Sequence, residues 1–261
     1  MKHGLLVANI GSYADPRAFV DVARTAEAAG WDAVLIWDHL AFTWGMPAAD
    51  PWVSLGAAAV STERVILGPG VTPVARRRPQ VLAHQLATLA TAAPGRVVFG
   101  AGLGGGHGEF ARFGEDEGEH ARAAKLDEGL DVVAALLSGR PVKHRGEHYT
   151  VDDVTLKPAP DPRIPIWIGG MSTKARARAQ RFDGWFADTA SPTGMTTTPG
   201  QFATMLEGYA FGDVAVMGYS NAADDALRRE YEAAGATWWI EQIFDRRGDA
   251  DEMRARVAAG P

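Results

Sequence analysis

Cysteine is absent from the 261 residues of this sequence. Its absence excludes disulfides, thiol nucleophiles, thiolate zinc sites and iron–sulfur clusters, and it suits a reducing compartment. Long apolar stretches are also missing: no run approaches the roughly 20 residues that a membrane-spanning helix needs. The N-terminus carries no cleavage pattern of a secretory signal. We therefore expect a cytoplasmic protein without a membrane segment.

The sequence also lacks a strong excess of positive or negative charge. The formal net charge is only −6, and the only basic run of note is Arg76-Arg77-Arg78. A nucleic-acid-binding protein normally shows a basic field, so we expect no nucleic-acid partner. The triple arginine either holds an anionic ligand tail or belongs to a solvated loop, and the solvated loop is the favoured interpretation.

What the sequence does contain is a regular alternation of apolar runs with helical patterns. Eight runs predict strands near residues 5–10, 33–37, 65–67, 97–99, 166–168, 185–187, 214–217 and 237–240. Helices are predicted at about 16–30, 51–61, 79–92, 117–137, 173–182, 199–209, 222–234 and 249–259. Parallel strands need helical crossovers, so the alternation predicts a closed (β/α)8 TIM barrel, formed as one domain over residues 1–261. Segment 140–157 predicts a β-hairpin inserted into this series.

In such a barrel the active site lies where strands end and the following loops begin. His39 follows Asp38 at the end of the second predicted strand. Imidazole is the side chain best suited to proton transfer near neutral pH, so His39 is a candidate acid or base, with a structural histidine at the barrel rim as the alternative. His107 and Glu109 lie in the loop after the fourth strand, and both are interpreted as solvated.

Two strand ends are rich in glycine. The segment Gly169-Gly170-Met171-Ser172 directly precedes a predicted helix, so its backbone N–H groups would suit a phosphate; a simple tight turn is the alternative. The segment Gly100–Gly105 matches the dinucleotide-binding fingerprint only formally, because no helix opens immediately after it. Close approach of its backbone to a flat ring is the better interpretation.

Five other candidate functional residues are predicted to have structural roles instead. His144 and His148 fall in the predicted hairpin with no third ligand in sight, so no metal site is expected. Trp185, Trp238 and Trp239 are interpreted as barrel packing rather than as a stacking platform.

Several segments, in this order along residues 1–190, resemble the luciferase-like monooxygenase superfamily. They are Val34–His39, Val65–Pro73, Ala83–Leu89, Gly95–Gly102, Leu126–Leu130, Pro165–Gly170 and Asp183–Phe186. The resemblance implies a barrel that binds reduced FMN or the deazaflavin coenzyme F420 and acts on a small organic substrate. Members with FMN activate oxygen, whereas members with coenzyme F420 transfer hydride. It also implies a homodimer.

The resemblance further implies the roles of individual residues. His39 would lie near the ring as proton donor or acceptor, and a non-prolyl cis peptide at Gly70–Val71 would support the face of the ring. The implied cofactor-binding residues are Asp38, Gly70, Val71, Thr72, Gly102, Leu103, Gly104, Gly169, Gly170, Met171 and Ser172. Coenzyme F420 is slightly favoured over FMN, because Asp38-His39 and the triple arginine would suit it.

The sequence departs from the family pattern in places. It is shortened around 190–215, where relatives usually have a long helix, and Ala93-Pro94-Gly95-Arg96 replaces the common Ser-Gly-Gly-Arg. These departures keep open a second hypothesis, a flavin-binding relative that has lost turnover. A third hypothesis is a barrel hydrolase that uses the carboxylates of Asp188 and Glu241.

Overall fold

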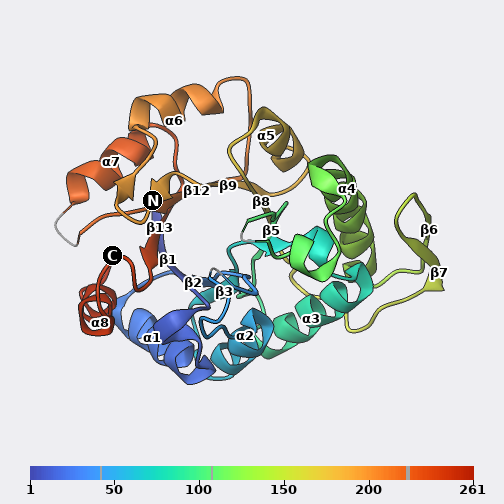
Figure 1. The fold of residues 1–261 in the computed structure, drawn as a ribbon, viewed down its shortest axis with the longest axis horizontal. Helices are drawn as coiled ribbons and strands as arrows, with labels where there is room; N and C mark the ends of the chain where they lie inside the picture. Colours follow the sequence, from blue (N-terminus) through green and yellow to red (C-terminus); the bar gives the residue numbers. More distant parts are fainter. Residues whose placement is uncertain (42, 107, 222–223) are drawn as a thin grey trace.

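A computed structural model describes residues 1–41, 43–106, 108–221 and 224–261 (Figure 1). The described residues form eight α-helices: α1 Pro16–Ala29, α2 Pro51–Ala59, α3 Pro79–Ala92, α4 Gly118–Leu137, α5 Thr173–Ala179, α6 Pro199–Leu206, α7 Asp225–Ala233 and α8 Ala250–Ala258. The strands are β1 Lys2–Val7, β2 Ala33–Ile36, β3 Ile66–Pro69, β4 Thr72–Pro73, β5 Phe99–Gly102, β6 Val142–Arg145, β7 Thr150–Val154, β8 Ile166–Gly169, β9 Gly184–Ala187, β10 Ala190–Ser191, β11 Gly194–Met195, β12 Asp213–Gly218 and β13 Trp238–Ile243.

Local signals set the helix ends. In α1 the Asp15 carboxylate accepts a hydrogen bond from the Arg17 N–H, proline occupies the first turn, and Gly30 ends the helix at a φ of 92°. Helix α2 begins in the same way, because Asp50 caps it ahead of Pro51. These are short-range contacts, and the predicted helices consequently start close to where the structure has them.

Nine parallel strands form the barrel in the order β3-β2-β1-β13-β12-β9-β8-β5-β4. A bridge between Leu67 of β3 and Val97, just ahead of β5, closes this series, with the Val98 N–H donating to the Leu67 carbonyl at 3.0 Å. Strands β3 and β4 are one barrel strand interrupted at the cis peptide Gly70–Val71, so the eight predicted strands are all present. The helices surround the barrel in Figure 1, as predicted for a (β/α)8 barrel.

Alternate side chains fill the barrel and pack beneath the helices. Trp238 points inward, where its ring lies edge-on to Trp167 with centroids 5.2 Å apart. The next residue, Trp239, points outward onto Tyr231 of α7, and Trp185 stacks on Phe202 of α6. The prediction that the tryptophans serve packing is therefore confirmed.

The inserted hairpin β6–β7 is antiparallel and lies outside the barrel, as predicted (Figure 1). Glu128 of α4 anchors it: its carboxylate accepts hydrogen bonds from the N–H groups of His148 (2.9 Å) and Tyr149 (2.8 Å). His144 Nε2 lies 2.9 Å from the same carboxylate. Within the described residues, no group of three or more His, Asp or Glu side chains could hold a metal ion.

Three further features concern the length of the helices, the shortened stretch around 190–215 and the start of α7. In the described part of the chain, no helix is both long and apolar enough to cross a bilayer. The shortened stretch around 190–215 holds a small β10–β11 hairpin and the two-turn helix α6, which Thr198 caps. Residues 222–223, where the seventh helix was predicted to begin, lie outside the described residues, and α7 starts at Asp225.

Candidate active site

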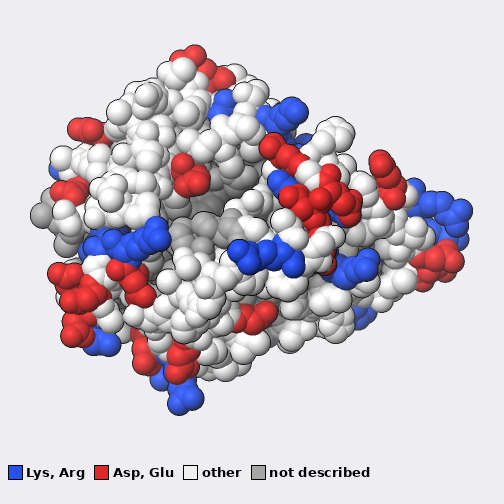
Figure 2. All heavy atoms as spheres, in the orientation of Figure 1, with Lys and Arg blue, Asp and Glu red and all other residues white. Residues whose placement is uncertain are grey.

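A cavity of about 540 Å³ opens at the carboxyl ends of the barrel strands. Figure 2 shows a hollow near the middle of this face, with acidic and basic side chains standing around it. Nine of the predicted site residues line the cavity: Asp38, His39, Gly70, Val71, Gly102, Leu103, Gly104, Gly169 and Gly170. Three do not line it: Thr72, Met171 and Ser172.

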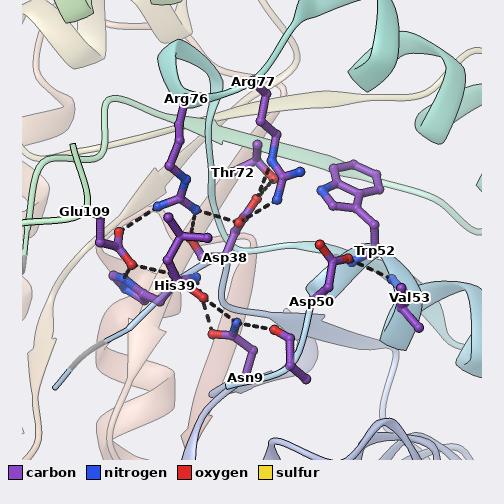
Figure 3. Close-up of polar contacts among 12 residues, drawn as sticks. Asn9, Asp38, His39, Asp50, Trp52, Val53, Thr72, Arg76, Arg77 and Glu109 are labelled. Atoms are coloured by element: carbon purple, nitrogen blue, oxygen red, sulfur yellow. Dashed lines mark hydrogen bonds and ion pairs between the residues drawn. The ribbon is translucent and has the colours of Figure 1, made fainter. Parts of the chain in front are cut away.

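Asp38 is buried, and its carboxylate is fully engaged by neighbouring side chains (Figure 3). Arg76 donates to Oδ1 at 2.7 Å, and Arg77 donates to both carboxylate oxygens, at 2.7 and 3.0 Å. The Thr72 hydroxyl donates to Oδ2 at 2.8 Å. Two guanidinium groups therefore neutralise this carboxylate, and its contribution is to hold Arg76 and the backbone ahead of His39 in place.

Arg76 links Asp38 to a second buried carboxylate. Its Nη1 donates to Oε2 of Glu109 at 2.7 Å, and the Glu109 side chain is only 1% exposed. The interpretation of Glu109 as solvated is therefore wrong, and so is the solvated-loop interpretation for Arg76 and Arg77. These charges lie inward because each is matched by an opposite charge, which the sequence pattern does not reveal. His107 lies outside the described residues.

Glu109 in turn contacts His39. Oε1 lies 3.3 Å from His39 Nδ1 and accepts hydrogen bonds from the N–H groups of Leu40 (2.5 Å) and Ala41 (3.1 Å). Burial by itself raises the pKa of Glu109, but the hydrogen bonds from His39 and Ala41 and the charges of His39 and Arg76 outweigh it and lower the pKa to about 2. Glu109 is thus ionised at neutral pH, and it favours the His39 tautomer with the proton on Nδ1.

The backbone of His39 is held from below by Asn9, which is fully buried at the end of β1. Asn9 Nδ2 donates to the carbonyl oxygens of His39 and Ala49, both at 2.7 Å, and Asn9 Oδ1 accepts from the His39 N–H at 3.3 Å. Trp37 lies edge-on to the imidazole, with ring centroids 5.5 Å apart. His39 therefore meets the cavity in one fixed orientation.

The opposite wall is built from glycine backbone around Val71, which follows the predicted cis peptide; that prediction is confirmed. A Cβ added to Gly102 would lie 2.5 Å from Val71 Cγ2, and one added to Gly169 would lie 3.0 Å from Val71 Cγ1. At Gly100 it would meet the Pro69 carbonyl oxygen at 2.2 Å. A side chain at Gly100 or Gly102 would clash, and one at Gly169 would crowd Val71, so these positions contribute backbone alone to the wall. A wall without projecting side chains at these positions suits a planar ring.

The turn before α5 has the geometry of a capped helix start. The Ser172 hydroxyl accepts from the Ala175 N–H at 3.1 Å, and Gly170 has a φ of 124°. Arg176 reaches back to donate to the Met171 carbonyl at 2.6 Å, and Lys174 is exposed. Gly169 and Gly170 join this turn to the cavity, whereas the binding of a phosphate here stays a prediction.

The paired-carboxylate hydrolase hypothesis is wrong. Asp188 lines the cavity, but Glu241 points out of the barrel, and its carboxylate accepts from Trp239 Nε1 (2.7 Å) and the Ser220 hydroxyl (2.5 Å) and pairs with Arg247. The neighbouring Gln242 points inward and lines the cavity. Neither Gln242 nor Arg76 is among the predicted catalytic or cofactor-binding residues. Strand alternation offers a signal for Gln242, and Arg76 was considered only as part of the triple arginine that could hold an anionic tail.

These features define a class of protein: a (β/α)8 barrel with an acid–base pair and a flat glycine wall at the carboxyl ends of its strands. Residues 4–255 match the family model described as luciferase-like monooxygenase, and the chain belongs to that family.

Similar proteins agree with this assignment. An F420-dependent glucose-6-phosphate dehydrogenase from Beutenbergia cavernae is 36% identical over 203 residues, which cover 76% of this chain and 60% of that protein. The chain spans 50% to 60% of the length of three curated relatives of this name.

Two solved structures share the fold. An F420-dependent secondary alcohol dehydrogenase in complex with an F420–acetone adduct has a TM-score of 0.81 and 19% identity, covering 98% of this chain and 97% of that chain. The coenzyme F420-dependent tetrahydromethanopterin reductase from Methanopyrus kandleri has a TM-score of 0.76 and 18% identity, covering 99% and 97%.

Proposed function

We propose that this protein is an oxidoreductase that uses coenzyme F420 for hydride transfer to or from a small organic substrate. The observation that carries the proposal is the cavity in which the His39–Glu109 pair faces a flat backbone wall at Val71. The relatives named F420-dependent dehydrogenases support it. Monooxygenation with reduced FMN is the second candidate, and the description of the family supports it.

The residues present fit a deazaflavin or flavin. The peptide at Gly70–Val71 and the backbone of Gly102–Gly104 would lie against the ring, because no side chain projects from the glycines there. The turn Gly169–Ser172 would hold the phosphate through its backbone N–H groups. When bound, the cofactor supplies the two-electron redox step, and the protein supplies position and proton transfer.

His39 is the residue that would transfer the proton. With Nδ1 held toward the ionised Glu109, Nε2 is the basic nitrogen of the ring, and it would take the proton from a substrate hydroxyl or return it to a carbonyl oxygen. Glu109 stabilises the imidazolium that forms when His39 has accepted the proton. Arg76 keeps Glu109 ionised, and Asp38 holds Arg76 in place.

Three further statements belong to this proposal. We take residues 1–261 as one functional domain because strands and helices alternate without an obvious linker, and the protein as cytoplasmic because it lacks cysteine and long apolar stretches. The homodimer rests on the expectation from the family. The glucose 6-phosphate for which several relatives are named is not transferred to this chain, which spans only part of their length. A mass measurement in solution that finds only monomer would refute the homodimer.

The test is a paired fluorescence titration with coenzyme F420 and FMN. Selective micromolar binding of F420 supports hydride transfer, and selective binding of FMN supports oxygen activation. If neither binds, the proposed function is wrong. Binding of F420 without any change in its oxidation state over a broad substrate panel would instead support the non-catalytic relative.

A further inference from the structure

The half of the cavity that continues from Gly169 and Gly170 onto the next strands has its own chemistry. It is formed by the ends of β9, β12 and β13, where Phe186, Met217 and the nearby Phe244 supply apolar surface. Two polar side chains interrupt this surface, Asp188 and Gln242. If the cofactor ring takes the glycine wall, this half is left for the substrate.

Asp188 differs from the other carboxylates of the cavity. Asp38 and Glu109 are matched by Arg76 and Arg77, whereas Asp188 makes no hydrogen bond or ion pair with any residue that the structure describes. Partial desolvation by the cavity walls raises the pKa of Asp188, although the residue stays exposed. Asp188 is exposed to the open cavity, so water can satisfy its carboxylate, and a substrate hydroxyl can take the place of that water.

Gln242 presents the complementary group. Its side chain is 2% exposed, and its amide Nε2 has no hydrogen-bond partner among the described residues. Residues alternate along β13, so Ile240 and Gln242 point into the barrel while Glu241 points out. A buried amide N–H without an acceptor is costly, and such a group is usually satisfied by a ligand or water.

The cavity is also poor in positive charge. Neither Lys nor Arg is among the described residues that line it. Lys and Arg side chains are visible on either side of the hollow in Figure 2, but they stand outside this lining. A phosphate group bound beside Asp188 would face an unmatched carboxylate with no cation in the described lining to offset the repulsion.

We propose that the substrate is an uncharged hydroxyl compound, which donates a hydrogen bond to Asp188 and accepts one from Gln242, and that the site rejects phosphorylated compounds. A hydroxyl group both donates and accepts, so it satisfies the two side chains together. Asp188 and Gln242 are specificity-determining residues in this scheme. The inference rests on the proposed function only for the position of the cofactor.

The experiment compares matched pairs of compounds that differ in one phosphate: glucose with glucose 6-phosphate, and glycerol with glycerol 3-phosphate. Binding is measured by thermal shift with and without coenzyme F420, and turnover is followed as the change in F420 absorbance. The wild type is expected to prefer the uncharged member of each pair by about 100-fold or more, which corresponds to about two unmade or repulsive polar contacts.

Two variants test whether Asp188 and Gln242 cause the preference for the uncharged compound. Asp188→Asn is expected to tighten binding of the phosphorylated member about tenfold, because it removes the charge and keeps the size. Gln242→Leu is expected to raise KM for the uncharged member about tenfold with a smaller change in kcat. Asp152→Asn, on the exposed hairpin strand β7, is the control and should change neither.

The outcomes separate the two proposals. Preference for the phosphorylated member, or no binding of either uncharged compound, overturns the substrate inference even if F420 binds. Unchanged discrimination in a folded Asp188→Asn protein also overturns it. Failure of F420 to bind while the thermal shift still favours the uncharged members refutes the proposed function and leaves the substrate inference supported.

Discussion

The buried Glu109 carboxylate offers the sharpest test of the site, through the substitution Glu109→Gln. The pKa of Glu109 is about 2, against an ordinary value of 4.5. One pKa unit corresponds to about 1.4 kcal/mol, so the ionised carboxylate contributes about 3 kcal/mol to the free energy of unfolding at neutral pH. Glutamine has the same shape but no charge, and its NH2 group would face either Arg76 or the N–H groups of Leu40 and Ala41.

The sign of the pH dependence follows from the lowered pKa. The contribution of Glu109 is fully present above its unfolded pKa and is lost as the pH falls toward the folded value of about 2. We therefore expect Glu109→Gln to lose about 3 kcal/mol at pH 7. The difference between wild type and variant should narrow by about 1.4 kcal/mol when the pH is lowered to about 3.5.

Urea unfolding of both proteins at the two pH values measures these quantities. Glu207→Gln is the matched control, because Glu207 is exposed and forms no ion pair with any residue that the structure describes; it should change stability by less than about 0.5 kcal/mol. A destabilisation by Glu109→Gln below about 1 kcal/mol at pH 7, or a difference independent of pH, would refute an ionised and paired Glu109.

Three further predictions address the residues around it. His39→Asn should lower turnover about 10²- to 10⁴-fold while cofactor affinity, measured by fluorescence, stays within about threefold; undiminished turnover would contradict the proton-transfer role. Asp38→Asn should cost about 3–5 kcal/mol in urea unfolding, because it leaves two buried guanidinium groups with one carboxylate between them. Gly102→Ala should destabilise the protein by about 1–3 kcal/mol and weaken F420 binding, since the new Cβ would overlap Val71. Gly56→Ala, whose Cβ meets nothing within 4 Å in helix α2, should be neutral or stabilising by up to about 1 kcal/mol.

The sequence by itself determined the barrel. Strand and helix periodicity, capping residues and turn glycines act over a few residues, so they could be recognised without the fold. Helix α3 covers the predicted residues 79–92, and the hairpin β6–β7 falls within 140–157. His39 and the cis peptide at Gly70–Val71 were also predictable, although through the family resemblance rather than from local physics.

Only the tertiary structure decided how the charged residues are used. Arg76 lies 38 positions from Asp38 and 33 from Glu109, and Glu109 lies 70 positions from His39. A charged residue in a loop has the same sequence pattern whether water or an opposite charge surrounds it, because the deciding partner comes from another β/α unit. The same holds for Asp188 and Gln242, whose unmatched polar groups become visible only when the barrel closes and brings their strand ends to one cavity.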